Sequence, residues 1–299
     1  MLVEGIRSAL PRFRRRQPAF IARTGDHRLG YAGFVADPQD GRWTITTLAA
    51  AMGVYAAEPL WEALIHHAVQ QAGLRGIRTI YARLPNTTNL EHAFQHENWT
   101  AFATETVFLG RDLRVTGSSA MMPRAIDIHD TWAVHQLYAT CVPREVQQAE
   151  AWTSRRWEVP KHQPATQLHL SGWVFDRGSD LAGYARVVSS GDRHVVEFLI
   201  HPDDRNQTPQ IIDGLLRAIA SRGLRRVSVV VRGYQSELAH PLEAAGFTPV
   251  FEQTVLVRHT TARVKRRATN VIRFPFHLRE RSARRVPTML RRTSEDGLS

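Results

Sequence analysis

Cysteine is almost absent from this sequence of 299 residues. Its single cysteine, Cys141, excludes an internal disulfide framework and a zinc site built from cysteines. Long apolar runs are also missing, because the most apolar stretch, residues 45–57, is too short and too rich in threonine to span a bilayer. The N-terminus lacks the apolar segment of a secretory signal. These absences predict a soluble protein of the reducing cytoplasm.

Motifs for nucleotides and metals are missing as well. No Walker loop and no G-x-G-x-x-G follow any strand-like segment, which argues against nucleotide hydrolysis and NAD chemistry. His92 and His96 are spaced as two metal ligands on a helix would be, but no third ligand accompanies them. The sequence therefore predicts no bound metal.

Positive charge gathers at the two ends of the chain. Residues 1–16 carry a net charge of +4 and residues 261–299 one of +8, which leaves −1 for everything between them. Basic arms of this kind bind nucleic acid or an anionic membrane surface, and they also occur as solvated ends that aid solubility. The sequence leaves these alternatives open.

What the chain does contain is an internal match. Phe20–Val35 aligns without a gap with Trp173–Val188, and the two stretches share the triplet Gly-Tyr-Ala at residues 30–32 and 183–185. Tyr31 and Tyr184 are therefore expected to pack on the same face of a strand in two copies of one unit.

A second match lies downstream at similar spacing. Residues 58–73 and 208–223 each have proline in the second place, which suits a first helical turn. Each stretch ends in glycine, Gly73 or Gly223, which suits the residue that ends a helix. Apolar residues recur between them at helical spacing. The sequence predicts two helices here.

Both halves show the same predicted order: hairpin, strand, helix, strand, helix, strand. The chain therefore divides into two α/β modules with flanking segments. The predicted parts are a basic arm (1–16), a partial and non-catalytic first module (17–112), a linker (113–124), a second module (125–260) and a basic tail (261–299).

The second module resembles the GNAT superfamily of N-acetyltransferases. The stretch "EFLIHPDDR", residues 197–205, follows the wording of that family's fourth strand and turn, and Gly246-Phe247 matches the phrase after its last helix. The resemblance implies an α/β (α+β) fold of two GNAT-like modules, each with a mixed, mostly antiparallel sheet flanked by helices. It implies transfer of an acyl group from acetyl-CoA or another acyl-CoA to an amine, on a small molecule or a peptide. The acceptor is expected between residues 131–158 and the hairpin at residues 173–188.

The resemblance also suggests which residues would hold the cofactor. These are Leu199, Ile200, Arg205, Asn206, Gln207 and Thr208. The loop departs from the family pattern, because it has no glycine and because Pro209 cannot donate an N–H to a phosphate. Thr208 is expected to cap the following helix. In the first module the same loop has Glu58, which would repel a pyrophosphate.

The predicted proton-handling residues are Glu197 and His194. Side chains alternate along a strand, so the two point to opposite faces unless a bulge intervenes. A solvated carboxylate and a turn histidine are the alternative readings. The family's acid position, usually tyrosine, is Leu242 here and Phe94 in the first module.

Three functions therefore compete. The first is an N-acyltransferase with its chemistry in the second module. The second is a catalytically inactive scaffold or acyl-CoA sensor. The third is an adaptor that binds nucleic acid or membrane through the basic ends. The sequence leaves the oligomeric state open.

Overall fold

The computed structural model describes residues 2–5, 17–23, 29–37, 41–50, 58–86, 90–113, 121–160 and 169–260. These residues belong to one compact unit, Met1–Arg263. The basic tail, most of the N-terminal arm, part of the predicted linker and the first-module loop at residues 51–57 lie outside the described residues. The module boundaries stay predictions.

The N-terminal half follows the predicted order of elements and adds one strand before it. Its elements are β1 (Leu2–Gly5), β2 (Ala19–Arg23), β3 (Leu29–Asp37), β4 (Arg42–Ala50), α1 (Glu58–Leu74), β5 (Thr79–Pro85), α2 (Glu91–His96) and β6 (Thr100–Arg111).

The C-terminal half opens with additional helices and then repeats that order. Its elements are β7 (Arg124–Ala125), η2 (Ile128–Asp130), α3 (Thr131–Cys141), α4 (Arg144–Glu150), η3 (Ser154–Trp157), β8 (His169–Arg177), β9 (Asp180–Ser190), β10 (Arg193–Ile200), η4 (Pro202–Gln207), α5 (Thr208–Ile219), η5 (Ala220–Arg222), β11 (Arg226–Arg232), η6 (Gly233–Leu238), α6 (Ala239–Ala244) and β12 (Thr248–His259).

All described strands join one sheet in the order β1-β2-β3-β4-β5-β12-β6-β11-β10-β9-β8-β7. Two neighbouring pairs, β4 with β5 and β10 with β11, are parallel, and the other pairs in the sheet are antiparallel. The predicted fold class, a mixed and mostly antiparallel α/β architecture flanked by helices, is confirmed.

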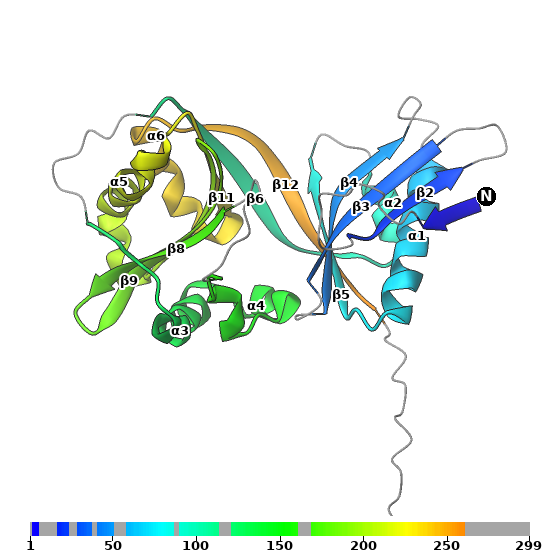
Figure 1. Cartoon of the computed structure of the whole chain (residues 1–299), viewed down its shortest axis with the longest axis horizontal. Helices are drawn as coiled ribbons and strands as arrows, with labels where there is room; N and C mark the ends of the chain where they lie inside the picture. The colour runs from blue at the N-terminus through cyan, green and yellow to red at the C-terminus, as the bar shows by residue number, and fades with distance from the viewer. Residues whose placement is uncertain are drawn as a thin grey trace, which may run out of the picture. The chain divides into compact units, whose positions relative to one another are not determined.

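The two halves exchange their last strands. β12 comes from the end of the C-terminal half, yet it pairs with β5 of the N-terminal half and with β6. β6 in turn pairs with β11 of the C-terminal half. Figure 1 shows β6 and β12 running side by side between the two groups of strands. Each half therefore completes the sheet of the other.

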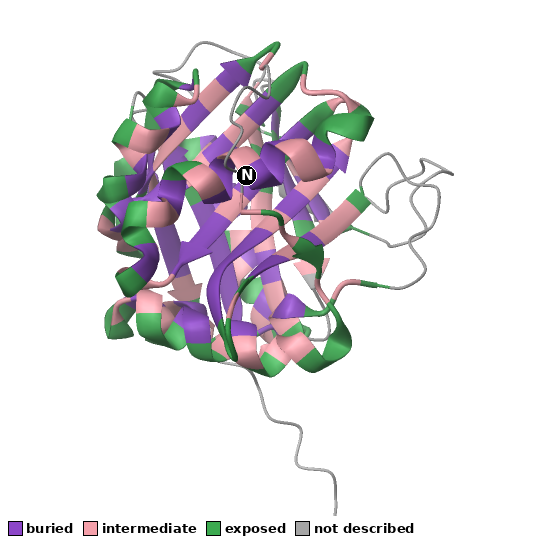
Figure 2. Cartoon of the chain, turned by 90° about the vertical axis from the view of Figure 1, so that its left-hand side faces the viewer, coloured by how far each residue is buried: buried purple, intermediate pink, exposed green. Residues whose placement is uncertain are grey.

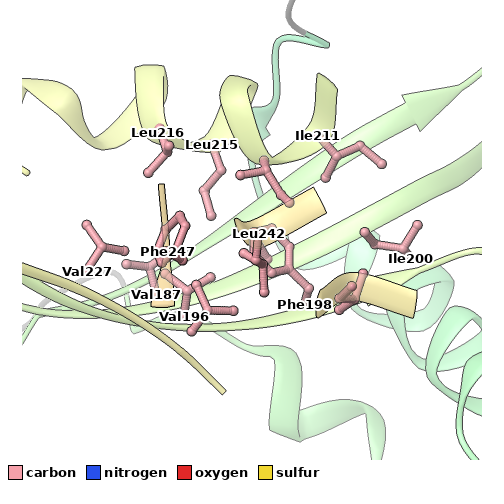
Figure 3. Close-up of a cluster of buried hydrophobic side chains, with 14 of the residues drawn as sticks. Val187, Val196, Phe198, Ile200, Ile211, Leu215, Leu216, Val227, Leu242 and Phe247 are labelled. Carbon is pink, nitrogen blue, oxygen red and sulfur yellow. The ribbon is translucent and has the colours of Figure 1, made fainter. Parts of the chain in front are cut away.

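Helix α5 covers one face of the C-terminal strands. Its buried leucines and isoleucines are those that the apolar spacing predicted: Ile211, Ile212, Leu215, Leu216 and Ile219. Figure 3 shows Ile211, Leu215 and Leu216 above strand residues that include Val187 and Val196. Figure 2 shows the same pattern for this half, with buried residues on the strands and on the helix faces turned toward them. The helical prediction is confirmed.

Of the two predicted helix ends, the one at Gly223 is confirmed and the one at Gly73 is wrong. Gly223 follows η5 and has a φ of 83°, which favours glycine at that position. Gly73, in contrast, lies inside α1, which continues to Leu74. The residue with positive φ after α1 is Gly76, at 73°.

Tyr31 and Tyr184 differ although they align. Tyr184 is 2% exposed and packs with residues of α3 and η3, whereas Tyr31 is 39% exposed. Ala32 and Phe34 point toward the core under α1, so Tyr31 points to the other face of the sheet. In the C-terminal half α3 and η3 cover that face. The expectation that both tyrosines pack is wrong for Tyr31.

Candidate functional site

The parallel strands β10 and β11 separate at one point. Their pairing begins at Arg193 and Arg226 and ends at Glu197 and Val230, although β10 continues to Ile200. The backbone of β10 beyond Glu197 therefore has no strand beside it on the β11 side.

A pocket opens at this separation. It encloses about 440 Å³, counting its open mouth. Its lining comes from α3, the turn between α4 and η3, η3, strands β9 to β11 and η6. The lining residues are Tyr138, Trp152, Trp157, Tyr184, Arg186, Glu197, Phe198, Leu199, Val230, Arg232, Tyr234 and Gln235. The region predicted for the acceptor, between residues 131–158 and the hairpin at residues 173–188, is thus where a pocket lies.

Glu197 is the carboxylate of this pocket, and two arginines face it. Its Oε2 lies 3.6 Å from Nη1 of Arg186 and 3.9 Å from Nη2 of Arg156, and about a third of its side chain is exposed. Burial alone would raise the pKa of Glu197, but the charges of Arg186 and Arg156 outweigh burial and lower it from 4.5 to about 2. A carboxylate of such low pKa is a poor general base near neutral pH. The geometry favours an ion-pairing role for Glu197.

A buried charge network stands behind the pocket and joins the two halves. Nη2 of Arg232 donates to Oε1 of Glu150 at 2.9 Å, and Nε of Arg232 lies 3.1 Å from Oε1 of Glu105 on β6. Glu105 also accepts from Arg83 at 2.9 Å and from Gln253 at 2.6 Å. Nη1 of Arg232 is buried and has no hydrogen-bond partner among the described residues.

Glu150 links this network to the aromatic wall. The hydroxyl of Tyr138 donates to Oε2 of Glu150 at 2.9 Å. Burial raises the pKa of Glu150 although the charge of Arg232 opposes it. Burial and the Glu150 carboxylate both raise the pKa of Tyr138, so its hydroxyl keeps its proton at neutral pH.

The N-terminal half also holds the end of α4, just before Trp152. The hydroxyl of Tyr81 donates to the carbonyl of Ala149 at 2.8 Å, and Nη2 of Arg42 donates to the carbonyl of Ala151 at 2.7 Å. Ala151 has a φ of 44°, a conformation that is unfavourable for a residue other than glycine. These contacts fix the turn that leads into the pocket wall.

Side chains already occupy the open edge of β10. Nε2 of Gln235 donates to the carbonyl of Phe198 at 2.8 Å, and its Oε1 accepts from the backbone N–H of Arg232 at 3.3 Å. The thiol of Cys141 donates to the carbonyl of Ile200 at 3.1 Å, and burial raises the pKa of that thiol to about 12. Gln235 therefore bridges the two strands where they part.

The predicted phosphate loop, residues 201–208, forms the short helix η4 and the start of α5. Its most exposed cation, Arg205, lies 3.0 Å from Glu237. The hydroxyl of Thr208 donates to the carbonyl of Arg205 at 2.7 Å instead of accepting from a helix N–H, so the predicted capping role is wrong. The N–H of Thr208 bonds to that same carbonyl, and Pro209 has no N–H.

The two acidic residues of this loop pair with side chains near them in the structure. Asp204 is buried and accepts from Arg177 at 2.8 Å and from Gln207 at 3.0 Å. Asp203 is largely exposed and adds a negative charge beside the start of α5. Of the residues predicted to hold a cofactor, Leu199 lines the pocket. Ile200 lies on its strand, and Arg205, Asn206, Gln207 and Thr208 lie in the loop.

His194 does not reach the pocket. It is buried, its Nδ1 lies 2.8 Å from the hydroxyl of Ser189, and its Nε2 lies 2.7 Å from the carbonyl of Gly223. Glu197 and His194 point to opposite faces of β10, as strand alternation predicts. The structure gives His194 a packing role between β9, β10 and the end of η5.

Several residues that line the pocket were not predicted from the sequence. Arg186, Arg232 and Trp157 carry no family motif, and they come from three separate elements. A charged residue in a mostly apolar strand was the available signal for Arg186, which follows the repeated Gly-Tyr-Ala directly. Nothing in the sequence indicated that Arg186 and Trp157 line the same pocket.

No metal-binding group was found in the described part of the chain, where histidine, cysteine and acidic residues never gather in threes around one point. None of the described helices is long and apolar enough to cross a membrane.

No family model matches the sequence, and no curated protein matches it significantly. Among solved structures, a conserved protein of unknown function from Staphylococcus epidermidis has a TM-score of 0.53 and 9% identity, over 77% of this chain and 91% of that one. A tandem GNAT protein from the clavulanic acid biosynthesis pathway has a TM-score of 0.49 and 12% identity, over 81% and 82% of the two chains. A GCN5-related N-acetyltransferase from Sphaerobacter thermophilus has a TM-score of 0.49 and 11% identity, over 81% and 80%. The likeness to the Staphylococcus epidermidis protein, at 9% identity, is one of fold alone.

Proposed function

We propose that this chain is an acyltransferase of the GNAT type that acylates an amine at the pocket in its C-terminal half. The observation that carries the proposal is the separation of β10 and β11 at Glu197, with a charged and aromatic pocket at that point. The stretch at residues 197–205 that resembles the family begins at the same residue.

The residues around the pocket fit the thioester arm of an acyl-CoA, but they do not fit its pyrophosphate. The space beside Phe198 and Ile200 offers an open strand edge on which the extended arm of a thioester can pair. Each backbone carbonyl has two lone pairs, so Gln235 and Cys141 leave one on each carbonyl. The loop, in contrast, offers neither of the first two amides of α5 to a pyrophosphate, because the N–H of Thr208 is bonded to the carbonyl of Arg205 and Pro209 has no N–H. The proposal therefore places the thioester arm in the opening and assigns no phosphate cradle.

The chain's own residues would bind and orient the acceptor. The thioester supplies an activated carbonyl carbon. Transfer joins the amine nitrogen to that carbon and releases the sulfur as a thiol, while one proton passes from nitrogen to sulfur through solvent. Glu197 stays ionised and holds the amine by its N–H groups. Tyr184, whose pKa is raised to about 12 by burial, keeps its hydroxyl proton and can donate a hydrogen bond.

The test is release of free thiol from acetyl-CoA and from S-acetylpantetheine, with a mixture of primary amines as acceptors. We expect amine-dependent release that Glu197→Gln reduces about tenfold or more. Glu158→Gln is the control, because Glu158 follows η3 and does not line the pocket. No thioester binding by calorimetry at millimolar concentration, together with no thiol release, would exclude acyl transfer.

A second candidate is an inactive module that binds a ligand without transferring a group. Gln235, which bridges Phe198 and Arg232, favours it because this side chain narrows the opening. Binding of an amine to the pocket with no thiol release would support that reading.

A further inference from the structure

The charges in the pocket do not balance. The carboxylate of Glu197 faces two guanidinium groups, those of Arg156 and Arg186, which we call the arginine pair. Arg232 is compensated separately by Glu105 and Glu150. The cluster of Glu197 and the arginine pair therefore carries one positive charge that no described side chain neutralises. Arg186 lines the pocket, and the guanidinium of Arg156 lies over the ring of Trp152, which lines it too.

The hydrogen bonds of the arginine pair are also unmade. Their side chains are 25% and 17% exposed. Both make ion pairs longer than 3.5 Å to Glu197, and within the described residues neither guanidinium donates a hydrogen bond. Nε of Arg156 is fully buried without a partner. Buried guanidinium groups bind carboxylates through parallel N–H donors, and an unmade donor of this kind is costly.

The distance between the carboxylate and the guanidinium groups also limits which ligands can meet both. The carboxylate that can hold an amine and the guanidinium groups that can hold an anion lie 3.6–3.9 Å apart. A ligand that meets both must carry its amine and its anionic group on the same carbon or on adjacent ones. Half of the lining residues are aromatic, and three of them, Tyr138, Trp157 and Tyr184, are almost fully buried around the space.

From these contacts we infer that the acceptor is an α-amino acid with an apolar or aromatic side chain. Its carboxylate binds the arginine pair, its amine lies against Glu197, and its side chain packs on the tyrosine and tryptophan rings. This inference rests on the proposed function for the role of the amine as acceptor, but the binding mode can be tested without any thioester.

The experiment is calorimetric titration of the full chain at neutral pH with three probes that share one phenyl ring. Phenylglycine has an amine and a carboxylate, benzoate lacks the amine, and benzylamine lacks the carboxylate. We expect phenylglycine to bind tightest, and benzylamine to bind about 10- to 100-fold more weakly because it leaves the arginine pair unmet.

The variants Arg186→Met and Arg156→Met should remove that preference for phenylglycine over benzylamine. Arg186→Lys keeps the positive charge but lacks the forked donors of a guanidinium, so it should retain only part of the preference. Because the charge is kept, this variant shows whether an effect of Arg186→Met comes from loss of folding. Arg217→Met is the matched control, because Arg217 pairs with Asp213 on α5 and does not line the pocket.

Equal binding of benzylamine and phenylglycine, or no binding of any carboxylate probe at millimolar concentration, would overturn the inference. The two proposals fail separately. Phenylglycine binding without thiol release removes acyl transfer and keeps the amino acid site. Thiol release with amines that lack a carboxylate removes the amino acid site and keeps acyl transfer.

Discussion

Arg232, at the end of β11, lies 3.1 Å from the carboxylate of Glu105 on β6, and both side chains are almost fully buried. The pair joins the pocket of the C-terminal half to a strand that comes from the N-terminal half. Glu105 accepts from two further side chains, so its charge is well compensated. Removal of either partner leaves the other with one counterion fewer in a buried site, because Arg232 keeps Glu150 and Glu105 keeps Arg83.

Glu105→Gln is therefore expected to lower the free energy of unfolding by about 3 kcal/mol, because Arg232 keeps its charge in a buried site. Urea unfolding followed by tryptophan fluorescence measures this change. Glu62→Gln is the control, since Glu62 forms an exposed pair with His96 and should cost about 1 kcal/mol or less. Equal effects for the two variants would show that the buried network contributes little.

Glu197 should make stability depend on acid pH. Its pKa in the folded chain is lowered from 4.5 to about 2, so the unfolded chain binds more protons between these values. Stability from this group is complete above pH 4.5 and is lost as the pH falls toward 2. After a discount for its exposed third, the loss is about 1–2 kcal/mol.

Unfolding curves of the wild type and of Glu197→Gln between pH 2 and pH 5 measure that contribution. The two stabilities should converge as the pH falls through this range. A constant difference between them would show that Glu197 titrates at its usual pKa.

Acetyl-CoA and S-acetylpantetheine should bind with affinities within about threefold of each other, because neither Thr208 nor Pro209 at the start of α5 offers a free amide to the pyrophosphate. Arg205→Ala should change neither affinity much, since Arg205 pairs with Glu237. Competition calorimetry measures both ligands. Tighter binding of acetyl-CoA by about tenfold or more, lost in Arg205→Ala, would restore the phosphate site that the sequence predicts.

His194→Ala should destabilise the fold and spare the pocket. Its two ring nitrogens bond Ser189 and the carbonyl of Gly223 inside the structure, so the variant should lose about 1–3 kcal/mol of unfolding free energy. Phenylglycine affinity, measured on the folded variant, should not change. A loss of affinity without a loss of stability would return His194 to the candidate site.

The basic tail supports a prediction from charge alone. Residues 261–299 hold +8 of the net charge of +11. Their removal should abolish salt-sensitive binding to duplex DNA, and to vesicles of anionic lipid, if the chain binds either one. Titration of DNA or vesicles into the full chain and into the deletion variant, at two salt concentrations, measures this effect. If the tail only aids solubility, the deletion changes neither binding curve.

Local patterns were sufficient to predict most of the fold. The apolar spacing of residues 208–223 predicted α5 and its buried face, and the repeated Gly-Tyr-Ala marked equivalent strands β3 and β9. The exchange of β6 and β12 left no such signal. An alternating strand carries the same pattern whichever neighbour it pairs with, so its partner depends on contacts remote in sequence.

The site was predicted only in part for the same reason. Glu197 stood in a family-like stretch and does line the pocket. The arginines that set its pKa come from η3 and β9, and only the folded chain brings them within 4 Å of it. The loop was expected to offer a capping Thr208, but the preceding short helix uses the amide and the hydroxyl of that residue.

The exchanged strands also determine when this protein can first become stable during its synthesis. A ribosome releases β5 and β6 long before β12, yet β12 is the strand that fills the place between them. The N-terminal half must therefore wait, with a gap in its sheet, until residue 259 has left the exit tunnel. The native sheet of each half is complete only when strands of both halves are present, so the last pairings of the fold form late.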